Sequence, residues 1–232
     1  MSKIKAVRDI AKDQLVSPLP LRKQSTRLLW EKTKRMVSNI EHICQLPELS
    51  RSGIDIDRVS LLAAAYFSLA ASSSGQRQRA TIKPGRHLEL SAEIASEKLE
   101  HIFPPQQIKK ISGTITESGN RFTRKLEAMI LSDIRNLDDM GITGIMNELS
   151  RYTLTGRTTA DLLQNWQKKI DYKYWHARLK EGFHFEPVRQ LAEARLDAAS
   201  QLMDQLRMEI NSIDFQNIAS ETQTVQSDTC LD

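Results

Sequence analysis

Apolar residues recur along most of the chain at intervals of three, four or seven, the spacing that places them on one face of an α-helix. This spacing predicts helices over about residues 26–46, 87–103 and 125–140, and two longer helices over about residues 159–181 and 186–211. A convincing alternation of period two, which is typical of half-buried strands, occurs nowhere in the sequence. The sequence therefore predicts an all-α protein.

One further segment, VSLLAAAYFSLAA from Val59 onward, is almost free of polar residues. A helix that is apolar on all sides is usually buried, so we expect this one at the centre of the fold. Asp57 is placed to cap its N-terminus. Further along, Pro104 and Pro105 are placed to end one helix and begin the next.

These patterns divide the chain into four parts. Residues 1–25 form a basic N-terminal segment, and residues 26–150 form a helical core. Residues 151–212 supply further helices that we expect to pack on that core. Residues 213–232 are polar, aperiodic and acidic without any Lys or Arg, so we expect a disordered tail.

Composition narrows the class of protein. A chain of 232 residues with 40% hydrophobic and 27% charged residues is typical of a globular domain. No apolar run approaches the roughly 18 residues that cross a membrane, and the start lacks the apolar region of a secretory signal. We therefore expect a cytoplasmic protein with no membrane partner.

The charge balance raises the question of an anionic partner. The net charge is +4 and the pI is about 9.1, which indicates either such a partner or an ordinary solvated basic surface. The sequence contains no clear helix-turn-helix signature and no aromatic platform for bases, so a nucleic-acid partner is not predicted.

Four stretches carry a likeness to a known family when taken in order: LLWEKTKRM, GIDIDRVSLLAAAYFSLA, HLELSAEIASEKL and ILSDIRNLDDMGITGI. Together they resemble the HD-domain metal-dependent phosphohydrolase superfamily over residues 26–150. The last stretch is the most specific, because it is similar to the family pattern LxDADxLDxxGxxGI. The resemblance implies an HD-domain-like helical bundle with additional C-terminal helices.

The same resemblance implies that the metal site is degenerate. In the family, a first His, a His-Asp doublet and a distant Asp bind a divalent cation, which activates water or a phosphoryl oxygen. By this likeness Lys32 takes the first position, Phe67 and Ser68 take the doublet, and Asp133 or Arg135 takes the last. A lysine ammonium offers a metal no lone pair, and a phenylalanine offers none either. We therefore expect no metal and no other cofactor.

The sequence leaves open how the helix predicted over about residues 125–140 is oriented. Residues two apart on a helix point about 200° apart, so only one of Asp133 and Arg135 faces the pocket. The neighbouring Asp138 and Asp139 either end the helix in solvent before Gly141 or take part in the pocket. Phe67 is expected to be buried in the space that a metal and its waters fill in active relatives.

Positive charge at these positions predicts a small anionic ligand, such as a nucleotide, that is bound without hydrolysis. The resemblance places substrate contacts in the loop after the central helix and at the start of the following helix. The candidate anion-binding residues there are Arg77, Arg79, Lys83, Arg86 and His87. Ordinary surface charges around a filled core explain the same residues equally well.

Two other functions stay open at this point. The first is a divergent, active phosphohydrolase that uses Asp133, His87 and loop residues around a displaced Mn, Fe, Ni or Zn ion. The second is a helical interaction or scaffold protein, whose C-terminal helix binds a protein partner or a second copy of the chain as a homodimer. The apolar spacing from Val188 to Leu206 suits either such pairing or packing on the core, and we expect packing.

Overall fold

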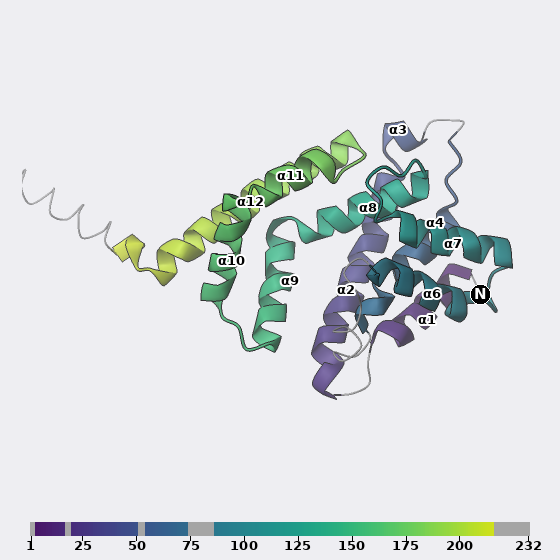
Figure 1. Cartoon of the computed structure of the whole chain (residues 1–232), viewed down its shortest axis with the longest axis horizontal. Coiled ribbons are helices and arrows are strands. Elements are labelled where there is room, and N and C mark those ends of the chain that lie inside the picture. The colour runs from purple at the N-terminus through teal and green to yellow at the C-terminus, as the bar shows by residue number, and fades with distance from the viewer. Residues whose placement is uncertain (1–2, 17–19, 51–53, 74–85, 216–232) are drawn as a thin grey trace, which may run out of the picture.

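The computed structural model describes residues 3–16, 20–50, 54–73 and 86–215. Every regular element in these ranges is a helix, which confirms the predicted all-α class (Figure 1). The predicted disordered tail lies almost wholly outside the described residues.

The helices fall into an N-terminal group and a C-terminal group. The first group consists of α1 (Lys3–Leu15), α2 (Pro20–Ile43), α3 (Pro47–Ser50), α4 (Arg58–Phe67), the 3-10 helix η1 (Ala70–Ser73), α6 (His87–Leu99), α7 (Pro105–Glu117) and α8 (Leu126–Asp139). The second group consists of α9 (Gly141–Leu154), α10 (Thr159–Asp171), α11 (Tyr174–Glu181) and α12 (Glu186–Ile210).

The apolar helix α4 lies at the centre of the first group, as its composition predicts. It contacts α1, α2, α6, α7 and α8, and seven of its ten residues are buried. Alanines at three successive positions let neighbouring helices approach closely, while Phe67 fills space with 0% of its surface exposed. The predicted cap is confirmed, because the Asp57 carboxylate accepts a hydrogen bond of 3.0 Å from the backbone N–H of Ser60.

The basic N-terminal segment contains a helix that belongs to the core. In α1, Val7, Ala11 and Leu15 recur every fourth residue, and each is fully buried. This face packs against α4 and η1. The lysines and arginines of α1 therefore lie on the outer side of an element that stabilises the bundle.

The predicted helix over residues 159–181 is wrong in one respect, because it is broken into α10 and α11. Lys173 adopts a left-handed conformation with φ 52°, which a continuous helix does not allow. The break folds the two helices toward each other and brings the rings of Trp166 and Trp175 to 5.4 Å. By contrast, α12 matches the prediction for residues 186–211 to within one residue.

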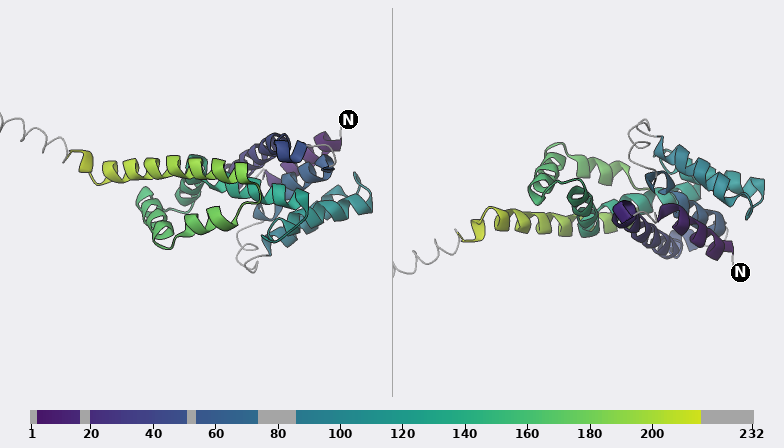
Figure 2. Two further views of the ribbon diagram at one scale, coloured as in Figure 1. Left: turned by 90° about the horizontal axis from the view of Figure 1, so that it is seen from above. Right: turned by 90° about the horizontal axis from the view of Figure 1, so that it is seen from below.

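The C-terminal helices pack on the rest of the chain through α8 and α9. Helix α12 buries Val188, Ala192, Ala199 and Met203, and it contacts α8, α9, α10 and α11. Its far end extends away from the N-terminal bundle in both views of Figure 2. Helix α12 therefore packs within the chain, mainly against α9 and α8.

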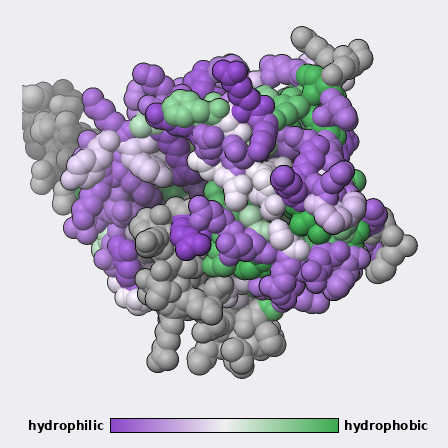
Figure 3. Space-filling view, turned by 45° about the vertical axis from the view of Figure 1, so that its right-hand side comes forward, coloured by the Kyte–Doolittle hydropathy of each residue, from purple (hydrophilic) through white to green (hydrophobic). Residues whose placement is uncertain are grey.

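On the face drawn in Figure 3, hydrophilic residues predominate, and hydrophobic residues show in patches between them. Within the described parts of the chain, none of the helices combines the length and the apolar character needed to cross a membrane.

We expect Phe67→Ala to lower the free energy of unfolding by about 3–5 kcal/mol, because the change leaves a cavity in the centre of the bundle. Urea denaturation would measure the loss. Phe122→Ala is the matched control, since Phe122 is 75% exposed and its removal should change stability by less than about 0.5 kcal/mol. Equal effects of the two changes would contradict the assignment of Phe67 to the core.

Candidate functional site

Helix α8 turns Asp133 into the protein interior. The side chain is fully buried, and its carboxylate accepts hydrogen bonds from the backbone N–H groups of His184 and Phe185 at 2.9 and 3.0 Å. The Nδ1 atom of His184 lies 2.8 Å from the same carboxylate. Burial raises the pKa of Asp133, although the hydrogen bonds from His184 and Phe185 oppose that shift. Asp133 thus anchors the segment that joins α11 to α12.

Arg135 points into a cavity instead. Its guanidinium is half-buried and donates a hydrogen bond of 3.1 Å from Nη1 to the Ser118 hydroxyl. Burial lowers the pKa of this group, but an arginine stays cationic at neutral pH. Among the described residues, Arg135 forms no ion pair with a carboxylate. Of the two residues, Arg135 therefore lines this cavity, and Asp133 does not.

We call this space the Arg135 cavity, and its volume is about 370 Å³. It lies between α2, α8, α11 and the loop that joins α7 to α8. Its charged lining consists of four cationic and two anionic side chains: Lys32, Arg121, Arg135, Arg178, Asp139 and Glu181. Positive charge is therefore in excess within the cavity.

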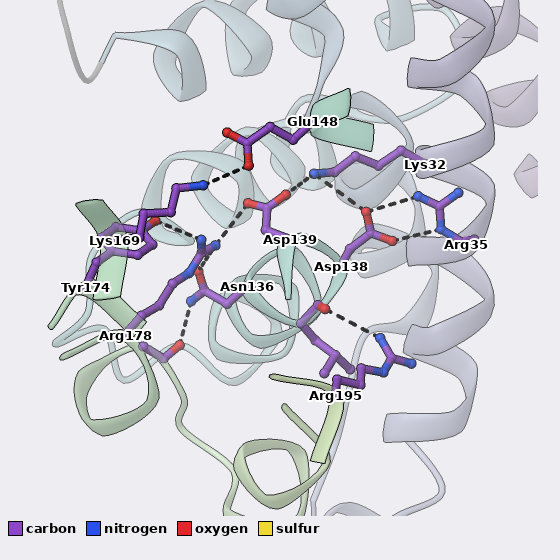
Figure 4. A network of polar contacts seen from close by, with 12 residues as sticks. Lys32, Arg35, Asn136, Asp138, Asp139, Glu148, Lys169, Tyr174, Arg178 and Arg195 are labelled. Carbon is purple, nitrogen blue, oxygen red and sulfur yellow. Dashed lines mark hydrogen bonds and ion pairs between the residues drawn. The ribbon is translucent and has the colours of Figure 1, made fainter. Parts of the chain in front are cut away.

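Asp138 and Asp139 are not free acidic groups in solvent. Asp138 is almost fully buried and accepts hydrogen bonds from Arg35 at 3.0 and 3.2 Å (Figure 4). Asp139 pairs with Lys32 and with Arg178, the latter at 2.9 Å. Lys32 is therefore paired with these carboxylates, whereas Arg135 forms no ion pair with a described carboxylate and feels the charge of Asp139 only from beyond ion-pair distance.

Opposing effects set the pKa of Asp139. Desolvation raises the pKa, but the charges and hydrogen bonds of Lys32 and Arg178 outweigh it, so the pKa lies below its ordinary value. Asp139 therefore stays ionised at neutral pH and holds both cations in place. Because its side chain is 46% exposed, solvent weakens each of these pairs.

The two glycines after α8, Gly141 and Gly144, stand where the chain packs too closely for a side chain. Gly141 has φ +82°, a conformation that other residues rarely adopt, and a Cβ there would lie 2.9 Å from the Arg195 side chain. A Cβ on Gly144 would lie 2.2 Å from the Asp139 carbonyl oxygen. The Gly-x-x-Gly sequence therefore lets α9 start directly against the end of α8.

Phe67 and Ser68 lie beside the cavity but do not line it. Both are buried, and the Ser68 hydroxyl donates to the Ala65 carbonyl at 3.0 Å. The next residue, Leu69, does line the cavity. The predicted burial of Phe67 is confirmed.

Of the five candidate anion-binding residues, the structure describes two, Arg86 and His87, and neither lines the cavity. Arg77, Arg79 and Lys83 lie outside the described residues. Arg86 is exposed and pairs with Glu89 at 3.1 Å, and His87 is exposed at the start of α6. The adjacent Leu88 does line the Arg135 cavity.

The residues at the four family positions do not suit a divalent cation. Lys32 and Arg135 bring positive charge, Phe67 has no donor atom, and the Ser68 hydroxyl is engaged with the backbone. Over the described ranges, no group of three His, Cys, Asp or Glu side chains could hold a metal ion.

A second cavity of about 370 Å³ lies on the other side of the Lys32, Asp139 and Arg178 contacts. Four cationic and two anionic side chains line it as well, but each of its cations pairs with a carboxylate; Lys169, for example, pairs with Glu148 at 2.8 Å (Figure 4). It offers no uncompensated group comparable to Arg135.

Sequence reasoning missed the contribution of α11 and the segment after it. Arg178, Glu181 and His184 all line the Arg135 cavity, yet they lie beyond the region that resembles the HD-domain family. The dense His and Arg content of YWHARLKEGFHFE was the available signal. Only the fold brings these residues to the end of α8.

Comparisons with protein-family models, with curated proteins and with solved structures found no match. Function is therefore inferred from the site alone.

We expect Asp133→Asn to lower the free energy of unfolding by about 1–3 kcal/mol, because the amide would leave at least one buried donor unsatisfied. Denaturation would measure the loss, and hydrogen exchange should become faster at the amides of His184 and Phe185. The control is Asp197→Asn, at an exposed position of α12. If exchange at the two amides stayed unchanged, Asp133 would not be the anchor of this segment.

Proposed function

We propose that this chain is a catalytically degenerate HD-domain protein that binds a phosphate-bearing anion, such as a nucleotide, without hydrolysing it. The ligand's phosphate occupies the Arg135 cavity. The observation that carries this proposal is the half-buried Arg135 guanidinium, which has no carboxylate partner among the described residues.

The charge distribution supports an anion over a cation. Arg178 and Lys32 share Asp139, and Arg121 pairs with Glu181, so each of these cations is at least partly neutralised. Arg135 forms no such ion pair among the described residues, although the nearby charge of Asp139 attracts it, and burying a charge without a direct partner is costly. An anion that enters the cavity supplies the missing partner.

The chemistry of the lining favours phosphate among anions. A guanidinium presents planar N–H donors that match two phosphate oxygens at once, and three arginines line this cavity. A volume of about 370 Å³ falls within the usual range of small-molecule sites. It accommodates a phosphate group together with part of the molecule that carries it.

The alternative of a divergent metal-dependent phosphohydrolase has less support. It relies on Asp133 and His87, but the Asp133 carboxylate already accepts hydrogen bonds from His184 and Phe185. His87 is exposed and lies outside the cavity lining. A displaced metal would have to find other ligands.

The alternative of an interaction protein that acts through α12 also has less support. This helix buries Val188, Ala192, Ala199 and Met203 and contacts α8 and α9, so packing within the chain accounts for most of its apolar residues, although Leu191 is 46% exposed. A homodimer or a protein partner would have to use other residues.

We expect Arg135→Met to weaken the binding of inorganic phosphate by about tenfold or more, because it removes a charge-assisted hydrogen-bond donor. Isothermal titration calorimetry at low salt would measure this. The phosphate affinity of Arg135→Lys should lie between those of wild type and Arg135→Met, since lysine keeps the charge but lacks the planar arrangement of N–H donors. Arg189→Met is the control, because Arg189 pairs with Glu186 on the same helix and lies outside the cavity. Equal phosphate affinity of wild type and Arg135→Met would rule the site out.

Elemental analysis of the purified protein should find no near-stoichiometric Mn, Fe, Ni or Zn, because Lys32 and Arg135 repel a cation at two of the four family positions. Added metal should likewise cause no release of phosphate from nucleotides. Stoichiometric metal together with metal-dependent hydrolysis would instead establish the divergent phosphohydrolase.

A further inference from the structure

The loop between α7 and α8 forms one wall of the Arg135 cavity and has a well-defined shape. Ser118, Gly119 and Arg121 line the cavity. Asn120 and Thr123 close a turn through a backbone hydrogen bond of 3.0 Å, and the Asn120 side chain accepts a second bond of 3.1 Å from the Phe122 backbone N–H. The loop thus holds its side chains in set directions.

At the tip of this turn, Phe122 is held out into solvent. It is 75% exposed, whereas Ser118 and Thr123 on either side of the turn are buried at 3% and 7%. Its ring lies 4.5 Å from the guanidinium carbon of Arg121, which covers one face of the ring. Its high exposure leaves the other face open.

Arg121 connects this ring to the cavity. The residue lines the Arg135 cavity, stacks over Phe122 and pairs with Glu181 at the end of α11. The exposed ring of Phe122 therefore lies against a residue of the cavity wall, and that residue is a cation.

We propose that Phe122 is a stacking platform for a flat, unsaturated ring on the phosphorylated ligand, and that the ligand class is a nucleoside phosphate. This inference rests on the proposed phosphate site and adds the part of the ligand that Arg135 does not recognise. The base lies against the open face of Phe122, while its phosphate lies in the cavity.

The physical basis is the general affinity of aromatic side chains for bases. Every base has a π-face, so an exposed ring stacks with any of them, and one such contact strengthens binding by about tenfold or more. A purine, with its larger surface, should gain more than a pyrimidine. An adjacent guanidinium strengthens such stacks further.

The test compares three probes on the full chain by calorimetry: inorganic phosphate, ribose 5-phosphate and adenosine 5′-monophosphate. The last two differ chiefly in the base. Wild type should bind the nucleotide about tenfold or more tightly than ribose 5-phosphate. Phe122→Ala should abolish that difference and leave the affinity for inorganic phosphate unchanged. Phe122→Trp should keep or increase the difference in affinity between the nucleotide and ribose 5-phosphate.

Tyr172→Ala is the matched control, because Tyr172 is another highly exposed aromatic, at 83%, and it does not line the cavity. Circular dichroism and urea denaturation should show that each variant folds like wild type.

Each outcome decides between the two proposals. Phosphate binding that depends on Arg135, with equal affinities for ribose 5-phosphate and the nucleotide, would overturn the stacking role and leave the phosphate site standing. A loss of phosphate affinity in Phe122→Ala would also overturn it, because Phe122 would then act only by holding Arg121. Failure of all three probes to bind would overturn the phosphate site and the stacking role together.

Discussion

The site depends on how the two negative charges at the end of α8 are neutralised. Asp138 and Asp139 lie at a helix C-terminus, where the helix dipole already places partial negative charge. Lys32 and Arg35 from α2 and Arg178 from α11 offset that charge. Three helices that are distant in sequence are thereby held at one point, and the Arg135 cavity forms beside it.

This neutralisation decides which charge the cavity presents to a ligand. Asp138 and Asp139 form ion pairs with cations from other helices, so neither pairs directly with Arg135, and Asp139 offsets its charge only in part. One turn earlier, Asp133 bonds to the segment before α12 and thereby places His184 and the end of α11 at the cavity. The same helix therefore carries the cation and positions the wall that surrounds it.

The sequence predicted what depends on local pattern and missed what depends on long-range contact. Periodicity located α12 and the buried α4, and the short polar side chain of Asp57 identified a cap. The break at Lys173 has no periodic signal, because apolar spacing continues from Trp166 to Trp175 while one residue turns left-handed. The orientation of α8 could not be read either, since it depends on how the other helices pack around it, chiefly α2, α7 and α4, together with α12.

Under the proposed function, cationic residues stand at the positions of metal ligands, and this has a definite chemical consequence. A divalent cation does two things for a phosphate: it attracts the negative oxygens, and it activates a bound water for attack. A guanidinium such as that of Arg135 attracts phosphate through charge and N–H donors, but it has no coordination position at which a water could lose a proton. If the chain descends from metal-dependent HD-domain enzymes, substitution at the ligand positions kept the attraction for phosphate and removed the means of cleaving it. Binding without hydrolysis is then the function that this arrangement can still perform.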